Sequence, residues 1–156
     1  MALHVVFVEP EIPPNTGNMA RTCAATDTVF HIVEPISFSI DEKAVKRAGL
    51  DYWPYVKLEV HHSLDEFLEK YKDHRMWLST TKGSQLYTDV QYKDEDMILF
   101  GRETAGLPRP FIDSRKEWAI RIPMSENTRL RSFNLSNSAN IVLFEALRQL
   151  GFPGLK

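Results

Sequence analysis

Three segments of the 156-residue chain combine glycines, amides, hydroxyls and arginines at spacings that suit the binding of a polar ligand. They cover residues 9–21, 98–108 and 120–140, and each lies at the end of a short apolar run. Turns leave backbone N–H groups available to bind a ligand, and side-chain amides and hydroxyls add further hydrogen bonds. We therefore expect a binding site built from loops.

The first segment predicts an anion site at the start of a helix. Asn15, Thr16 and Asn18 can cap a helix over residues 15–27, and the free N–H groups at such an end attract an anion. Arg21 falls about one turn inside this helix, where the macrodipole disfavours a cation unless phosphate or another anion meets it. A solvated arginine on the helix flank is the alternative.

The second and third segments also favour a ligand. Gly101 lets a ligand approach the backbone, Gly106 permits a tight turn, and Glu103 between them can accept hydrogen bonds. A plain turn before a proline-started helix explains these residues equally well. The third segment has more polar side chains at the entry of an apolar helix than capping requires. They are Asn134, Ser136, Asn137 and Asn140.

Several common sites are excluded. None of the seven glycines forms a G-x-G-x-x-G pattern, and residues 101–106 are not followed by the lysine of a phosphate-binding loop. The five histidines lie apart from any Cys, Asp or Glu at ligand spacing, so we expect no metal site. Adjacent His61 and His62 point to opposite faces of an extended segment. Cys23 has small neighbours and is expected to be a buried packing residue.

Apolar runs of strand length alternate with helical patterns. Strands are predicted at residues 3–8, 30–33, 56–60, 76–79, 97–100 and 119–122. Helices are predicted at 15–27, 41–48 and 136–150, and after Ser63, which forms a capping box with Glu66. The alternation predicts an α/β fold with a mainly parallel sheet flanked by helices, in one domain. In such sheets ligands bind at the carboxyl ends of the strands, where the three polar segments fall.

The composition predicts a cytoplasmic globular protein. The net charge is −2, but residues 102–131 hold seven Lys or Arg against four Asp or Glu, a local excess that suits phosphate binding or a solvated face. The single cysteine fits a reducing compartment. No run approaches the roughly 20 apolar residues of a membrane span, and no signal peptide is recognisable, so we expect no membrane partner.

The last predicted helix is apolar on more than one side. Ile141, Phe144 and Leu147 widen an apolar face that already runs from Leu135 to Leu150. Such a helix normally requires two surfaces to bury it. One is the domain core, and the other is either a second subunit or more of the same core.

Jointly, the three segments resemble the motifs of the SPOUT RNA methyltransferases. The matching stretches are NTGN (15–18) with Arg21, FGRETAGLP (100–108), IRIPM (120–124) and SFNLSN (132–137). They occur in the family's order and spacing over nearly the whole chain. EPEIPP (9–14) and RAGLDYW (47–53) look most like the subfamily of tRNA (cytidine/uridine-34)-2′-O-methyltransferases. Ala105 and Phe144 depart from the family pattern, which bears on RNA contact and not on the cofactor site.

The resemblance implies a single SPOUT domain over residues 1–156, with a trefoil knot in about residues 79–156. It implies S-adenosylmethionine as cofactor, a homodimer that completes each active site, Arg21 as the catalytic arginine and no resident metal. Arg129 and Arg131 are expected to contact RNA phosphates. The implied cofactor-binding residues are Ser79, Thr80, Gly101, Glu103, Gly106, Ile122, Ser132, Leu135, Ser136 and Asn137.

The implied reaction is transfer of a methyl group to the ribose 2′-hydroxyl of the wobble nucleotide, position 34, of leucine tRNAs. Arg21 is a poor general base because the pKa of arginine exceeds about 12. We therefore expect it to position a phosphate or stabilise developing negative charge. Methylation of another tRNA or rRNA site and a non-catalytic RNA-binding module of the same fold are the alternatives.

Overall fold

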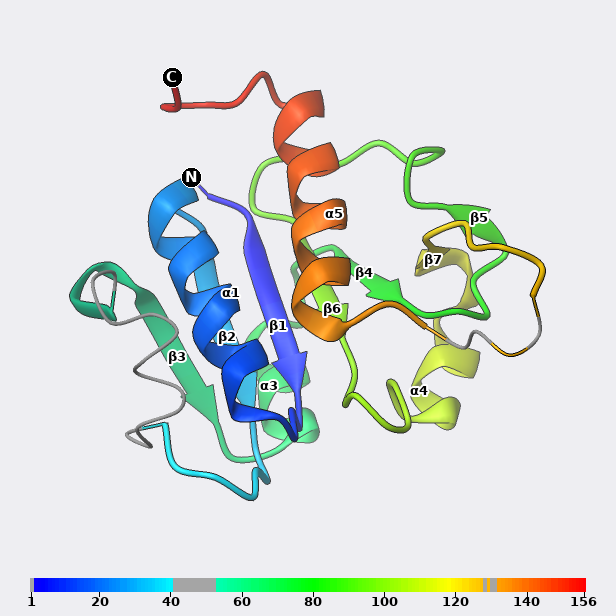
Figure 1. Ribbon diagram of the computed structural model, residues 1–156, viewed down its shortest axis with the longest axis horizontal. Helices are drawn as coiled ribbons and strands as arrows, with labels where there is room; N and C mark the ends of the chain where they lie inside the picture. Colours follow the sequence, from blue (N-terminus) through cyan, green and yellow to red (C-terminus); the bar gives the residue numbers. More distant parts are fainter. Residues whose placement is uncertain (1, 41–52, 128, 130–131) are drawn as a thin grey trace.

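The computed structural model describes residues 2–40, 53–127, 129 and 132–156. Within these residues one seven-stranded sheet has the order β3-β2-β1-β6-β4-β7-β5 (Figure 1). Every strand pair in it is parallel. The strands are β1 (His4–Val8), β2 (Val29–Val33), β3 (Lys57–His61), β4 (Met76–Ser79), β5 (Gln85–Leu86), β6 (Met97–Phe100) and β7 (Ala119–Arg121).

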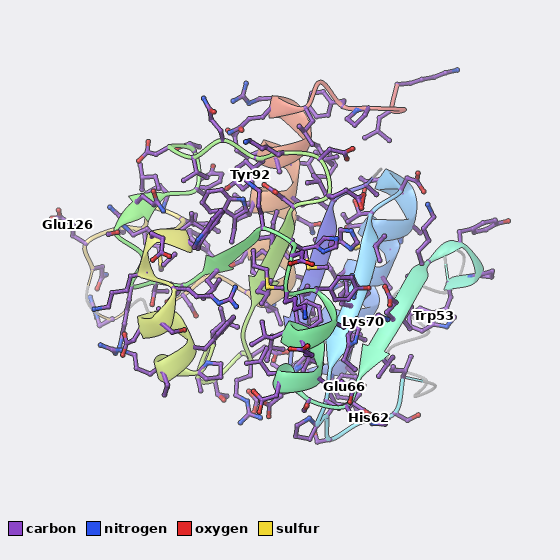
Figure 2. All side chains as sticks on the ribbon, turned by 180° about the vertical axis from the view of Figure 1, so that it is seen from behind. Trp53, His62, Glu66, Lys70, Tyr92 and Glu126 are labelled. Carbon is purple, nitrogen blue, oxygen red and sulfur yellow. The ribbon has the colours of Figure 1, made fainter. Side chains whose placement is uncertain are left out.

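Helices cover both faces of this sheet. On the face toward the viewer in Figure 1 lie α1 (Pro13–Thr26) and α5 (Leu135–Gln149). On the opposite face, seen in Figure 2, lie α3 (Leu64–Lys70) and α4 (Arg109–Ser114). Two short 3-10 helices, η1 (Trp53–Tyr55) and η2 (Lys116–Trp118), precede β3 and β7.

The central strands are apolar throughout because both of their faces are buried. In β1, Val5 and Phe7 belong to the core beneath α1 and α5, whereas Val6 and Val8 belong to the core beneath α3 and α4. All four side chains are almost fully buried. Continuous apolar runs are typical of strands covered on both sides. Cys23 lies in the first core and is fully buried, which confirms its predicted packing role.

The six predicted strands and the mainly parallel α/β sheet are confirmed, with ends that differ by one residue or less. The short β5 was missed because its two residues show no apolar run. The predicted helix over residues 41–48 lies outside the described residues. The predicted knot is not tested by these contacts and stays a prediction.

The chain path sets up a ligand site beside β1. From β1 the chain proceeds outward through β2 to β3, and then returns to build β4 and β6 on the other side of β1. The strand order therefore reverses between β1 and β6. In open parallel sheets this switch point leaves a crevice at the carboxyl ends of the strands, where ligands bind.

Candidate functional site

A cavity of about 820 Å³ opens at this carboxyl edge. It is lined by the ends of three neighbouring strands: Val8 of β1, Ser79 of β4 and Phe100 of β6. Ile122, just after β7, and Leu135, the first residue of α5, complete the wall. The volume lies within the range of small-molecule sites.

The structure brings most of the predicted site residues together in this pocket. Eight of the ten implied cofactor contacts line it: Ser79, Thr80, Gly101, Glu103, Gly106, Ile122, Ser132 and Leu135. Ser136 is buried behind the wall, and Asn137 is exposed at the start of α5. Arg129 is exposed, and Arg131 lies outside the described residues. Lys82 of the wall lies outside the three segments, and Met124 and Phe133 lie within the matching stretches but were not among the implied cofactor contacts.

The loop after β6 folds back on itself, and two glycines make this possible. Gly106 adopts a φ of 72° and its N–H donates to the carbonyl of Arg102 over 2.8 Å. A Cβ on Gly101 would lie 1.9 Å from the carbonyl carbon of Gly106. Gly106 therefore serves the predicted tight turn. Gly101 is required first by the returning loop, and not only by the approach of a ligand.

Glu103 supplies the anion that was predicted for the first segment. Its Oε1 accepts from the backbone N–H of Glu11, and its Oε2 accepts from the N–H of Ile12, both at 2.8 Å. Its Oε2 also accepts from Asn15 Nδ2 over 3.0 Å. Carboxylates stabilise the amino end of a helix through such bonds. The loop after β6 thus fixes the start of α1.

The capping prediction for α1 was wrong. The helix begins at Pro13, two residues earlier than predicted, and its N-cap residue is Ile12, which makes no side-chain cap. Proline suits this first position because its missing N–H has no helical partner there. Asn15 therefore lies within the first turn, where its side chain is free to bond to Glu103.

A chain of polar contacts joins all three sequence segments. Asn15, which donates to Glu103, accepts at its Oδ1 from the hydroxyl of Ser136 over 3.3 Å. The side chain of Asn134 caps α5 by accepting from the backbone N–H of Asn137 over 3.2 Å. The Oδ1 of Asn134 also lies 2.8 Å from the Ser136 hydroxyl. This network explains part of the excess of polar side chains at the start of α5, which we had expected to bind a ligand.

Arg21 lies farther along α1 than predicted. Because the helix begins at Pro13, Arg21 is eight residues into it, or about two turns. The macrodipole falls off within the first turn, so it does not disfavour a cation there. The side chain is exposed, and Arg21 is not among the residues that line the pocket.

Charged side chains brace the rim of the pocket. Arg102 Nη2 donates to Glu9 Oε1 over 2.9 Å, which ties the loop after β6 to the end of β1. Glu11 Oε1 accepts from both the backbone and the hydroxyl of Thr104. These hydrogen bonds lower the pKa of Glu11. Two of the acidic groups of the first segment therefore hold the loop of the second.

The histidines were expected to lie apart from any Cys, Asp or Glu at ligand spacing, but the fold gathers four of them and brings Glu59 and Glu95 within such spacing. His4, His31 and His61 form a row across β1, β2 and β3, and His74 packs against His4. His4 and His31 are two residues apart in strand register, and so are His31 and His61, so all three share one face of the sheet. Sequence spacing alone could not reveal this row, because the register depends on which strands pair.

The pocket suits a ligand that is apolar in part and polar in part. Ile122, Leu107 and Leu135 offer apolar wall, while Ser79 and Thr80 offer hydroxyl groups at the end of β4. A nucleoside has the same division, with a flat base and a hydroxylated sugar. The residues present therefore fit a nucleoside-based cofactor.

The fold and the pocket define a parallel α/β protein with a ligand site at the switch point of its sheet. The sequence model of the SpoU rRNA Methylase family matches residues 2–144. The chain belongs to this family.

Full-length relatives narrow the comparison. An Escherichia coli (strain K12) tRNA (cytidine(34)-2′-O)-methyltransferase is 47% identical over 153 residues, covering 97% of this chain and 96% of that protein. A Bacillus subtilis (strain 168) protein provisionally given the same name is 49% identical over 159 residues, covering 100% and 98%. A solved structure described as "Structural insights into the 2-OH methylation of C/U34 on tRNA" superposes with a TM-score of 0.91 at 38% identity, covering 96% of this chain and 97% of that one.

Proposed function

We propose that this protein transfers a methyl group from S-adenosylmethionine to the ribose 2′-hydroxyl of nucleotide 34 of tRNA. The pocket carries the proposal, because it gathers eight of the predicted cofactor contacts at the switch point. Family membership supports methyl transfer to RNA. The full-length relative from Escherichia coli supports nucleotide 34 as the site.

The cofactor supplies an electrophilic methyl group on a positively charged sulfur. In this chain the loop after β6 and the ends of β4 and β7 would hold it. Ser79 and Thr80 would offer hydroxyl groups to it, and Ile122 and Leu135 would offer apolar wall. Ser136 acts behind the wall by holding Asn15, and through it Glu103. Backbone groups exposed in the loop around Gly106 provide further hydrogen bonds.

The reaction forms a bond between the ribose oxygen and the methyl carbon and breaks the bond between that carbon and sulfur. The hydroxyl proton leaves to an acceptor. Arg21 does not take this proton, because arginine stays protonated in proteins. Its guanidinium instead fixes an RNA phosphate or stabilises charge on the ribose oxygen. Holding the two reactants in line supplies much of the remaining acceleration.

The proposal includes a homodimer that completes each site. Arg21 is not among the residues that line the pocket of its own subunit. In a dimer, Arg21 of one subunit would instead serve the pocket of the other subunit. Phe144 of α5 is 45% exposed, although Val142 and Leu143 beside it are fully buried. Ile12 and Phe133, at the pocket, are 46% and 41% exposed. Large exposed apolar side chains of this kind favour a subunit interface.

The finer details of the proposal rest on the resemblance of the three motifs. They are leucine tRNAs as substrates, a single domain over residues 1–156 and a knot in about residues 79–156. RNA phosphates are contacted by Arg129, which is exposed, and by Arg131. The protein acts in the cytoplasm, where tRNA is modified. Among the described helices, none has the length and apolar character of a membrane span.

Arg21→Ala tests the role of Arg21 in methyl transfer. Purified wild-type and variant proteins are compared for S-adenosylmethionine binding by calorimetry and for transfer of labelled methyl groups to tRNA. The control is Arg148→Ala, an exposed arginine paired with Glu145 near the end of α5. We expect Arg21→Ala to abolish transfer and to keep cofactor binding, while the control keeps both. Transfer by Arg21→Ala at the control's rate would contradict the assignment.

A further inference from the structure

A row of histidines crosses the sheet on the face covered by α3. His4 Nδ1 lies 2.8 Å from His31 Nε2, and His31 Nδ1 lies 3.0 Å from His61 Nε2. Beyond the His4 end, His74 packs edge-on against His4 with ring centroids 5.7 Å apart. Figure 2 views this face, with Lys70 labelled on α3 and His62 near the lower, carboxyl edge.

The row leaves one buried nitrogen without a hydrogen-bond partner. Each contact between two rings holds one hydrogen, because a neutral imidazole carries a single N–H. When His4 donates from Nδ1 to His31, its Nε2 keeps a lone pair. His4 is 7% exposed, and its Nε2 has no hydrogen-bond partner among the described residues. Metal-binding histidines have this arrangement, because they donate their second N–H to a neighbouring group.

Two further ligands lie beside this nitrogen. The ligand atoms of His4, His74 and Glu95 are all within 4.8 Å of one another, and Glu95 Oε1 is 3.6 Å from His4 Nε2. Ligand atoms about 2 Å from a tetrahedral zinc ion are roughly 3.3 Å apart. The separations between the three groups therefore need to shrink by at most about 1.5 Å to hold an ion. Two histidines and one carboxylate, with water as fourth ligand, form a recurrent zinc site.

Buried Asp96 holds the three ligands in place. Its carbonyl accepts from the backbone N–H of His4 over 3.0 Å, which joins the start of β1 to the turn that carries Glu95. Its carboxylate pairs with Arg75, the residue after His74, over 2.8 Å. The site is therefore preorganised before any ion arrives.

We propose that His4, His74 and Glu95 form a binding site for one divalent transition-metal ion, with zinc as the best match. This replaces the expectation that the chain has no metal site. The site lies at the amino edge of the sheet, where β1 begins, and thus opposite the pocket (Figure 1). The ion joins the start of β1, the segment after α3 and the turn before β6, and so stabilises the fold without taking part in methyl transfer.

A second group of possible ligands fits less well. His31, Glu59 and His61 also have ligand atoms within 4.8 Å of one another. Glu59, however, already accepts hydrogen bonds from Lys70 and Tyr71. Both ring nitrogens of His31 face other imidazoles. Glu59 and Glu95 therefore give a matched pair of substitutions that distinguishes the two groups.

Cobalt(II) titration of the untagged, chelator-treated protein tests the proposal. Cobalt(II) reports its coordination through visible absorption, and zinc(II) competition gives the affinity for zinc. The variants are His74→Asn and Glu95→Gln, with Glu59→Gln and exposed His62→Asn as controls. Circular dichroism shows whether each variant is folded. Thermal unfolding with and without zinc(II) supplies a second measurement.

We expect one cobalt ion per chain, displaced by zinc, and a rise in Tm with zinc. His74→Asn and Glu95→Gln should each weaken binding by at least about tenfold and remove the Tm shift, because each loses a ligand. The controls should bind within about twofold of wild type. Absence of stoichiometric binding to the folded wild type would overturn the proposal. Loss of binding in Glu59→Gln with retention in Glu95→Gln would overturn it as well.

Discussion

Glu103→Gln tests how the loop after β6 positions the start of α1. The carboxylate accepts three hydrogen bonds, from the N–H groups of Glu11 and Ile12 and from the amide of Asn15. A glutamine keeps the shape but turns one oxygen into an NH₂ group, which then faces a donor. Its remaining oxygen is uncharged. An unsatisfied donor costs about 1–3 kcal/mol, and hydrogen bonds to charged groups are stronger than neutral ones.

The free energy that holds the start of α1 in place should fall by about 2 kcal/mol, the middle of that range. The site is partly exposed, so water replaces some of the lost hydrogen bonding. Every 1.4 kcal/mol is a factor of ten, so kcat/KM for tRNA should fall roughly thirtyfold. The affinity for S-adenosylmethionine should fall too, because Ile12 and Asn15 line the pocket. Steady-state methyl transfer and calorimetric cofactor titration measure the two effects.

Glu11→Gln is the matched control for this prediction. Glu11 joins the same two loops, but it bonds to Thr104 at the exposed rim, and one oxygen makes both bonds. A glutamine can keep both of them through its carbonyl oxygen. We expect its kcat/KM to stay within about threefold of wild type. Equal kinetics for Glu103→Gln and Glu11→Gln would refute the role assigned to Glu103.

The loop after β6, the buried histidines and Arg129 each allow a further test. Gly101→Ala should reduce cofactor affinity by at least about tenfold, because its Cβ would meet the Gly106 backbone at 1.9 Å. Gly106→Ala has open space at the Cβ and should cost only about 1–2 kcal/mol of strain in the left-handed backbone conformation. A calorimetric titration in which Gly106→Ala loses more cofactor affinity than Gly101→Ala would contradict both predictions. Burial lowers the pKa of His31 to about 3, so its stabilising contribution is complete above the unfolded pKa of about 6.5 and is lost as pH falls toward 3. In a buffer that contains a chelator, titration of His31 should make the free energy of unfolding by urea about 2 kcal/mol lower at pH 5 than at pH 7. Equal free energies of unfolding at the two pH values would contradict the burial argument. Arg129→Ala should lower the salt slope of tRNA binding by about one, measured as log K against log salt, and an unchanged slope would exclude a phosphate contact.

The sheet could be predicted because buried parallel strands consist of continuous runs of apolar residues. Residues 76–79 and 97–100 were placed at their observed ends, since turn residues bound each run. The position of the pocket followed from the same pattern, because polar residues after such strands must gather at one edge. Tight turns were predictable where glycine permits positive φ, as at Gly106.

Contacts between distant segments could not be predicted in the same way. Glu103 meets the start of α1 across about ninety residues of chain, and sequence reasoning assigned that N–H site to a ligand. The start of α1 was misplaced because Asn15 resembles a cap, whereas Ile12 lacks any capping side chain. The histidine row depends on strand pairing, which places His4 beside His31 only after β1 and β2 are aligned.

The most direct test of the proposed function is to map the methylated nucleotide. The protein is incubated with labelled S-adenosylmethionine and total bacterial tRNA lacking wobble methylation, and nuclease digestion with mass spectrometry locates the label. We expect a 2′-O-methyl group on nucleotide 34, with leucine tRNAs carrying the label. Label at another RNA position, or no transfer by a protein that binds the cofactor, would contradict it.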